Sequence, residues 1–371
     1  MRFIPRLHRY FIVEILRGSL SAFAAVFIIV SVGMLFSYWQ DGYAAHLLTI
    51  LGYSIPQIFV FAVPVSFFAG IVLALGRVAS EQEFTLLRAC GVGLSQVYIP
   101  LAFFSLLVTS LLLVIWDRVV PWGEAHIRAT INEAAFDALK GLDGKERRRV
   151  VMPNMEITFF ETTGRNLRPI SVIQSDETTK RMIYADNFNV TFPPDESYVS
   201  IELVHGFITD ETDENLPKTN FNSLTFDIPG PKERKPDVYI NRNLLSLTGV
   251  LFEAARIMDV ASHAANPLEA QKLERVARRH VAHFHYIVAT SVAPLFLLFV
   301  AVPLALLLGR GGRVIGISAA VLFIFAVYYP LLLGGRHLAE SGAPIASWIS
   351  LNLPNIGAVI VGAFLQIFIR K

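Results

Sequence analysis

His280, His283 and His285 are the one cluster of histidines in the sequence, at spacings of three and two residues. Imidazole nitrogens are common zinc ligands, but a zinc site needs three or four ligands placed close together. The chain has a single cysteine, Cys90, and no HExxH or CxxC motif that would supply them. We interpret the three histidines as a polar belt where a helix enters a membrane, and a metal centre as the less favoured alternative.

The sequence also lacks the usual signatures of nucleotide binding and nucleophilic catalysis. The segment Gly309–Arg313 is rich in glycine and basic, but it has neither the lysine nor the preceding strand of a phosphate-binding loop. We interpret it as a tight turn, and we predict that the chain itself binds no cofactor. Glu340 with His337 is the only close acid and base pair near the predicted outer face. Because of this pair, one alternative function remains open, that of a membrane enzyme acting on an envelope lipid.

The segment from Arg77 to Gly91 is the sharpest local feature, and its pattern predicts a short helix at about 78–90. Ser80 is a suitable N-cap, Glu81 and Glu83 would lie in the first turn, Arg88 in the last turn, and Gly91 would end the helix. Apolar residues give this helix one apolar side. Two interpretations remain: a helix lying on the membrane surface, or a docking element whose acidic residues meet basic residues of a cytoplasmic partner.

The composition indicates the elements that must carry these residues. Apolar residues make up 54% of the 371-residue chain and charged residues only 17%, whereas soluble domains contain roughly 25% charged residues. Residues 117–282 hold 46 of the 62 charged residues. A segment of ordinary soluble composition is therefore inserted into a membrane protein. This pattern argues against a single globular enzyme, a disordered protein or a nucleic-acid-binding protein.

Six apolar segments are long enough to cross a bilayer core of about 30 Å. They are residues 18–39, 47–76, 95–116, 286–309, 314–335 and 345–369, and none has an acidic or basic residue in its interior. The first is too long for a signal peptide, so we expect an uncleaved span. Outside residues 117–285, ten of the eleven Lys and Arg residues lie on the side of the two termini, which predicts that both termini are cytoplasmic. Without ionisable residues at membrane depth, a proton relay is not expected.

The long central loop is predicted to be a β domain. Short runs rich in β-branched and aromatic residues occur at 155–161, 182–188, 199–204 and 222–227, and turn-forming residues separate them. We therefore expect a polytopic α-helical membrane protein with an inserted all-β, jelly-roll-like periplasmic domain. The expected parts are residues 1–116 with spans one to three, 117–285 with the β fold at about 140–240 followed by connecting helices, and 286–371 with spans four to six. Asn266, Pro267 and Glu269 predict the start of a helix that runs into span four.

The loop segment Leu75–Gly91 resembles the loop of the lipopolysaccharide export permease family, the LptF/LptG subunits. The similarity extends in order along the chain, through Arg9-Tyr10, Val63–Ser66, Val302–Leu304, Gly311–Arg313 and Leu353–Asn355. Ala89-Cys90-Gly91 is more similar to the F-type subunit than to the G-type.

The resemblance implies an ABC-type permease subunit of the bacterial inner membrane that extracts lipopolysaccharide and passes it to a periplasmic bridge. ATP would be bound by a partner, an LptB-like ATPase dimer that grips the loop helix at Glu81, Glu83 and Arg88. The other implied partners are an LptG-like second permease and an LptC-like bridge protein. A gate would involve spans one and five.

One departure from the family affects the expected lipid contacts. F-type subunits can carry basic residues in span one, where this chain has Ile29 and Val32. Contacts with lipid phosphates would then come from the partner subunit or from Arg336. A second alternative function, besides the membrane enzyme, is a non-transporting envelope assembly module. Copurification with an ATPase would separate this alternative from the permease.

Overall fold

The structure is a computed structural model, and it falls into two compact units. It describes residues 3–41, 43–91, 93–140, 148–152, 155–160, 169–175, 180–191, 198–210, 218–229, 241–264, 266–309, 313–342 and 345–370. The helical unit comprises residues 1–31, 56–121 and 245–371, and the second unit comprises residues 32–55 and 122–244. The predicted turn at 309–313 lies mostly outside the described residues.

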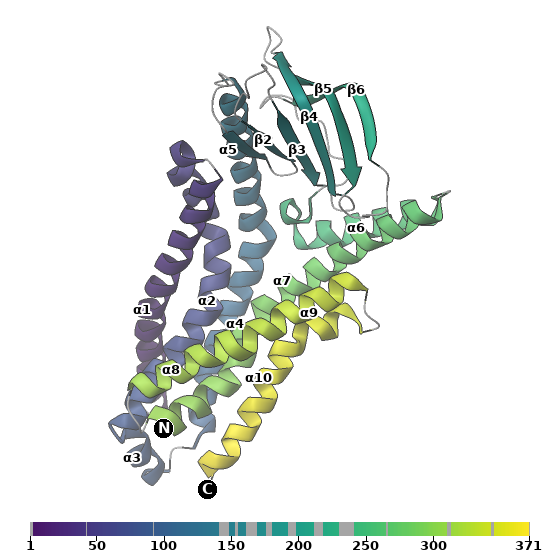
Figure 1. Cartoon of the computed structure of the whole chain (residues 1–371). Coiled ribbons are helices and arrows are strands. Elements are labelled where there is room, and N and C mark those ends of the chain that lie inside the picture. Colours follow the sequence, from purple (N-terminus) through teal and green to yellow (C-terminus); the bar gives the residue numbers. More distant parts are fainter. Residues whose placement is uncertain are drawn as a thin grey trace. The chain divides into compact units, whose positions relative to one another are not determined.

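Among the residues that the structure describes, six helical segments are long and apolar enough to cross a membrane, in agreement with the predicted number of spans (Figure 1). They are α1 (Phe3–Gln40), α2 (Leu47–Ser80), α4 (Ser95–Val114), α7 (Pro267–Leu308), α8 (Arg313–Phe323) with α9 (Tyr329–Ser341), and α10 (Ser347–Arg370). A π-helical turn, Ile115–Val119, joins α4 to α5 (Val120–Lys140), and another, Ile324–Tyr328, joins α8 to α9. The shorter helices are α3 (Glu83–Ala89) and α6 (Leu247–Ser262), with single turns at Ala44–His46 and Arg242–Leu244.

The helix that enters span four begins as predicted. Asn266 is the N-cap of α7, and its side-chain oxygen accepts a hydrogen bond from the backbone N–H of Leu268 at 3.0 Å. Pro267 takes the first helical position, where its missing N–H leaves no hydrogen bond unmade. The single helix α7 therefore contains both the charged segment and span four.

The helical unit is held together by apolar packing and by close approaches at small residues. Phe68, Ile71 and Leu297 are almost fully buried in its core. At the crossing of α1 and α2, a Cβ atom added to Gly18 would lie 2.9 Å from the carbonyl oxygen of Gly70. Small residues at such crossings let helix backbones approach closely, which is how membrane helices gain packing energy where burial from water contributes little.

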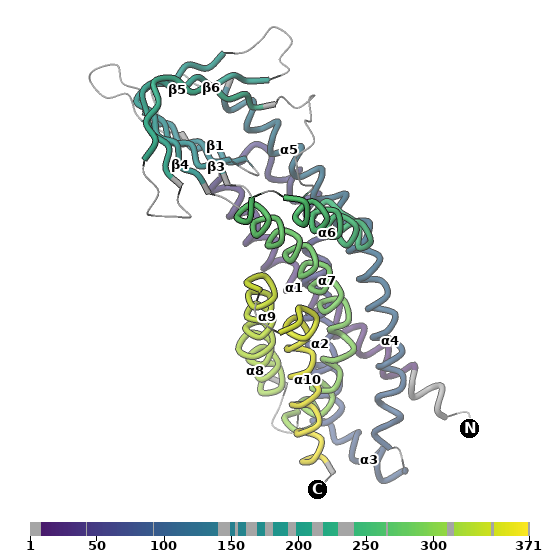
Figure 2. The backbone as a smooth tube through the Cα atoms, turned by 90° about the vertical axis from the view of Figure 1, so that its right-hand side faces the viewer, coloured from purple at the N-terminus to yellow at the C-terminus, as the bar shows by residue number. Residues whose placement is uncertain are grey.

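The second unit contains one antiparallel sheet of six strands among the described residues. The strands are β1 (Arg148–Met152), β2 (Met155–Phe159), β3 (Ile170–Ser175), β4 (Lys180–Thr191), β5 (Tyr198–Asp210) and β6 (Thr219–Pro229). Each strand pairs with its neighbour in the sequence, so the sheet order is β1-β2-β3-β4-β5-β6. All four predicted runs coincide with strands, the first of them as far as Phe159, and the sheet is strongly curved (Figure 2). The jelly-roll arrangement stays a prediction.

The core of the sheet includes residues from the helix that precedes it. Phe136 and Leu139 of α5 are buried in the same apolar cluster as Ile157, Phe159 and Ile201 of the sheet. Strand residues that point to one face alternate along the chain, and α5 covers that face. The helix is thus a structural part of the β domain, and a domain boundary at residue 140 would remove it.

We expect a fragment of residues 122–244 to fold as a mainly β domain and to be more stable than a fragment of residues 140–240. The reason is that the shorter fragment exposes the apolar face that Phe136 and Leu139 cover. Loss of two large buried side chains costs several kcal/mol, about 2 to 5 for each. Circular dichroism and thermal unfolding of both fragments measure the difference. Equal melting temperatures, or a mainly helical spectrum, would contradict this prediction.

Candidate functional site

The short helix predicted at about 78–90 is present as α3, but it begins later than predicted. Ser80 is the last residue of α2, where its hydroxyl donates to the carbonyl oxygen of Arg77 at 2.8 Å, so its assignment as N-cap is wrong. The chain turns at Gln82, which has a left-handed backbone with a φ of 59°. Glu83 is then the first residue of α3, and Glu81 lies in the turn before it.

The end of α3 is as predicted. The backbone N–H groups of Cys90 and Gly91 donate to the carbonyl oxygens of Leu86 and Arg88, at 3.0 and 2.9 Å. Gly91 has a φ of 81°, which glycine adopts without steric cost. The helix has only seven residues and two well-defined ends.

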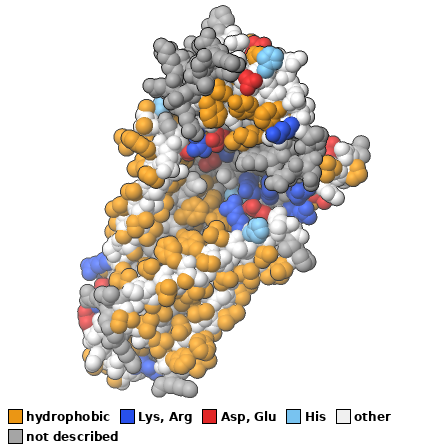
Figure 3. Space-filling model, in the orientation of Figure 1, with side chains coloured by type: hydrophobic (Ala, Val, Ile, Leu, Met, Phe, Trp, Pro, Cys, Tyr) orange, Lys and Arg blue, Asp and Glu red, His pale blue; other side chains and the backbone are white. Residues whose placement is uncertain are grey.

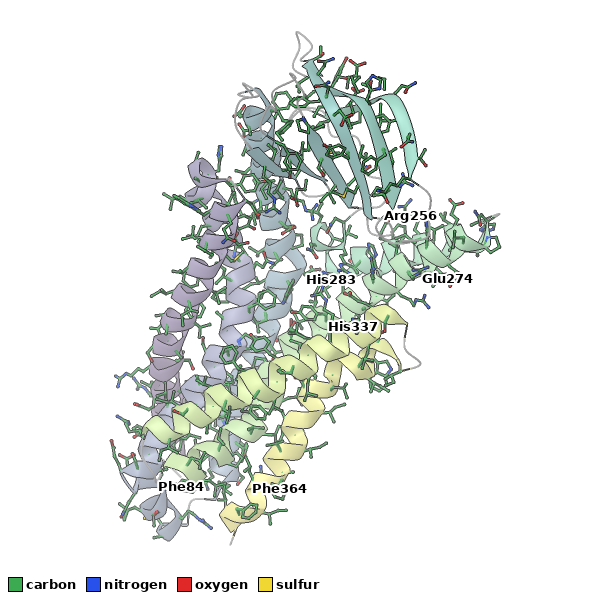
Figure 4. The ribbon with its side chains drawn as sticks, in the orientation of Figure 1. Phe84, Arg256, Glu274, His283, His337 and Phe364 are labelled. Atoms are coloured by element: carbon green, nitrogen blue, oxygen red, sulfur yellow. The ribbon has the colours of Figure 1, made fainter. Side chains whose placement is uncertain are left out.

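Two faces of α3 have different surroundings. Phe84 points into the apolar core of the helical unit and is only 6% exposed. Leu86, in contrast, is 66% exposed, and Glu81 and Arg88 are exposed as well. Figure 4 shows Phe84 at the end of the helical unit where α3 lies. The buried face packs α3 against the core of the helical unit, and the other face is accessible to a partner.

A network of polar side chains joins α3 to α1 and α2. The Tyr10 hydroxyl of α1 donates to Oε2 of Glu83 at 2.8 Å and accepts from Nη2 of Arg77 at 3.2 Å. The same Nη2 lies 3.0 Å from Oε2 of Glu14. Neither Tyr10 nor Glu14 was predicted as a site residue. The signal for Glu14 was available, since it is the one acidic residue among the basic residues before span one.

Arg88 connects α3 to the end of the chain. Its Nη1 donates to the backbone carbonyl of Ile369 in α10 at 3.5 Å. Figure 1 shows α3 and the two termini at the same end of the helical unit. Three of the predicted site residues, Glu81, Glu83 and Arg88, are thus brought together at this end.

Arg336, the fourth predicted residue, lies on α9 at the other end of the helical unit. Its guanidinium carbon is 4.9 Å from the centroid of the Tyr286 ring, and its Nε is 3.0 Å from Oε1 of Glu340. His337 follows Arg336 on α9, and Figure 4 places it at this end together with His283 and Arg256. Figure 3 shows Lys and Arg gathered near this end and hydrophobic side chains over the rest of the helices on that face.

The three clustered histidines do not form a common site. His280 is buried, and its Nδ1 donates to the carbonyl oxygen of Val276 in the same helix at 2.9 Å. His283 is buried near the ring of Trp116, with 6.3 Å between the ring centroids. Over the part of the chain that the structure describes, no three His, Cys, Asp or Glu residues are close enough to hold a metal ion.

Together these features define the class of protein to which the chain belongs. Six membrane-capable helices, an inserted antiparallel sheet and a short helix anchored between spans two and three describe a multi-pass membrane protein with a separate β domain. The family described as "Lipopolysaccharide export system permease LptF/LptG" matches residues 9–368. This match covers nearly the whole sequence, and the chain therefore belongs to the LptF/LptG family.

Individual relatives are similar over a shorter stretch. The lipopolysaccharide export system permease protein LptF of Escherichia coli K12 is 31% identical over 90 residues, and so is the protein of the same name from Shigella flexneri. Each match covers 24% of this chain and 24% of the relative. The chain thus spans about a quarter of the length of these relatives, and both are F-type proteins.

Proposed function

We propose that this chain is the F-type permease subunit of a lipopolysaccharide exporter in a bacterial inner membrane. The observation that carries the proposal is α3, a short helix anchored by Phe84 and joined to span one, in a chain of the LptF/LptG family. Such a helix suits the transfer of force from a separate motor protein. The similarity to proteins named LptF supports the F-type assignment.

The charge distribution supports an orientation with both termini in the cytoplasm. Arg77 and Arg88 lie at the end of the helical unit that carries α3 and the termini, and Arg336 lies at the other end. Basic residues in short loops favour the cytoplasmic side of a membrane, whereas long loops cross it largely regardless of their charge. The other Lys and Arg residues near the α9 end belong to the long segment between spans three and four, so they do not oppose this orientation. In this orientation α3 faces the cytoplasm and the β domain is periplasmic.

The exposed side of α3 is the proposed contact with a cytoplasmic ATPase dimer of the LptB type. Glu81 and Arg88 would make polar contacts at the edge, and Leu86 would enter an apolar pocket of the partner. Glu83 would contribute its negative charge to a basic group of the ATPase. ATP is bound by the partner in this proposal, which agrees with the missing phosphate-binding loop.

Spans one and five are the proposed walls of the lipid path. Leu20 and Ile29 of α1 are 70% and 71% exposed, and Leu322 and Phe325 of the α8–α9 segment are 67% and 65% exposed. Exposed apolar side chains on these two helices suit contact with acyl chains and with an LptG-like second subunit. Arg336 is the proposed contact of this chain with a lipid phosphate.

The curved sheet is the proposed route out of the membrane. We infer that its strands complete a jelly roll whose apolar interior holds acyl chains and aligns with an LptC-like bridge protein. An open antiparallel sheet presents unpaired backbone groups at its edges, and another β domain can pair with such an edge.

The proposal is tested by copurification followed by reconstitution. We expect the tagged chain to copurify with an ATPase and a second permease, and we expect lipopolysaccharide to stimulate ATP hydrolysis in vesicles that contain the complex. An ATPase that copurifies but is not stimulated by the lipid would favour the alternative of a non-transporting assembly module. Absence of any ATPase would contradict the proposal.

The two faces of α3 give a separate prediction. Leu86→Asp is expected to weaken binding of the ATPase with little change in thermal stability, because Leu86 is 66% exposed in the chain. Phe84→Ala is expected to lower the stability of the chain by about 3 to 5 kcal/mol, as for other buried aromatic residues. Thermal unfolding of the purified chain and pull-down of the ATPase measure the two effects. A reversed pattern, with Leu86→Asp the destabilising change, would contradict the assignment of the two faces.

A further inference from the structure

We infer that Tyr10 is a positioning residue that makes α1 and α3 move together, so that Glu83 transmits force to span one. The inference rests on the proposed function, and it adds a residue and a path to it. Glu83 would otherwise be only a charge on the surface of α3. In the structure it is also the point where α1 is attached to that helix.

The geometry gives Glu83 two separate tasks. Its Oε2 accepts the hydrogen bond from Tyr10 at 2.8 Å, whereas Oε1 accepts none from the residues that the structure describes. One oxygen can therefore hold α1 while the other faces a cationic group of a partner. A hydrogen bond to a carboxylate is stronger than one between neutral groups, so this link is suited to bear load.

The position of Tyr10 is itself fixed from α2. Arg77 donates to the Tyr10 oxygen at 3.2 Å, which leaves the hydroxyl proton for Glu83. Arg77 is in turn held by Glu14, one helical turn after Tyr10 on α1, at 3.0 Å. The Glu14 side chain is only 15% exposed, so water competes weakly for this ion pair. The Tyr10 hydroxyl therefore donates its proton toward Glu83. Removal of the hydroxyl should break the hydrogen bond to Glu83.

The test compares three variants of the full chain in its complex with the ATPase and second subunit. Tyr10→Phe keeps the ring and removes the hydroxyl. Glu83→Gln keeps an acceptor oxygen for Tyr10 but removes the charge. Tyr98→Phe is the control, because it also removes one hydroxyl between two helices, the one that accepts from Gln366 at 2.8 Å.

Two quantities are measured. The first is lipid transported per ATP hydrolysed in vesicles. The second is the distance between spin labels on α3 and α1. Cys90 is exposed and is the only cysteine of the chain, so it takes one label directly, and Leu16→Cys, at a 45% exposed position of α1 outside the proposed lipid path, takes the other. The partner subunits are used without cysteines.

We expect Tyr10→Phe to reduce transport per ATP about tenfold, the effect of losing one hydrogen bond to a charged group. The distance distribution should broaden and change on addition of nucleotide in this variant. It should broaden less in Glu83→Gln, whose amide oxygen still accepts a weaker hydrogen bond from Tyr10, and it should stay narrow in Tyr98→Phe. A Tyr10→Phe variant with the distances and transport ratio of Tyr98→Phe would overturn the inference. Failure of the proposed function is distinct, because the unmodified complex would then show no hydrolysis stimulated by lipid.

Discussion

Replacement of Glu83 by alanine is expected to reduce lipid-stimulated ATP hydrolysis at least tenfold while the chain still inserts into the membrane. The variant removes the acceptor of the Tyr10 hydrogen bond and the acidic group that faces the proposed ATPase. Each interaction with a charged group contributes about 1.5 to 3 kcal/mol, and a loss of 1.4 kcal/mol corresponds to a factor of about ten. Hydrolysis in reconstituted vesicles, with and without lipopolysaccharide, measures this effect.

Glu269→Ala is a suitable control for this variant. Glu269 is also a glutamate in the first turn of a helix, but it is exposed, whereas Glu83 is half-buried, and it lies at the start of α7. Its replacement should leave the stimulated rate within a factor of two. Equal losses in both variants would show a general effect of removing negative charge, and an unchanged rate in Glu83→Ala would contradict the proposed coupling.

Gly335→Ala is expected to destabilise the packing of α9 against α10. A Cβ atom at this position would lie 2.0 Å from the carbonyl oxygen of Ser350, so the two helices must separate. Introducing a methyl group into a closely packed interface costs about 1 to 3 kcal/mol. Thermal unfolding in detergent is expected to show a lower midpoint. Because Arg336 is the next residue, binding of lipopolysaccharide should weaken as well.

The neighbouring glycine provides the control. A Cβ atom added to Gly334 would meet no atom within 4 Å. Gly334→Ala should therefore be neutral or slightly stabilising, by at most about 1 kcal/mol, since alanine favours the helix. Similar losses in both variants would mean that flexibility of the helix, and not its contact with Ser350, determines the effect.

The membrane-spanning part of the fold could be predicted because the relevant signal is local. Each span is a run of about 20 residues without internal charges, and in a bilayer such a run has few possible structures other than a membrane-spanning helix. The π-helical turns Ile115–Val119 and Ile324–Tyr328 were not predicted. A π-helical turn contains one residue more than an α-helical turn but has the same hydropathy. The apolar pattern of the sequence therefore does not reveal it.

Two strands were missed for a different reason. Strand β1 begins with Arg148 and Arg149, and Arg149 pairs with Glu156 of β2 at 2.7 Å, so a charged segment becomes a strand through its neighbour. Strand β3 is only six residues long and contains three polar residues. In both cases cross-strand contacts decide the structure, and these contacts are not visible in the periodicity of one segment.

The candidate site was predicted in part. The loop helix and its end at Gly91 follow from local preferences, but Ser80 was misplaced because α2 continues to it. Val78 and Ala79 are buried in the helical core, and this burial outweighs the preference of serine for an N-cap. The hydrogen bond from Tyr10 to Glu83 joins residues 73 positions apart, so only the folded chain brings them together.

The sequential order of the six strands has a consequence for biosynthesis. Each strand pairs with the one made just before it, so contacts form between segments that are near in the chain. Pairing between sequence neighbours closes shorter loops than pairing between distant strands would, so less loop-closure entropy opposes each step. Phe136, which covers the sheet, is made before the first strand. The β domain can therefore fold from its N-terminal side as the ribosome extends the chain, before spans four to six have been synthesised.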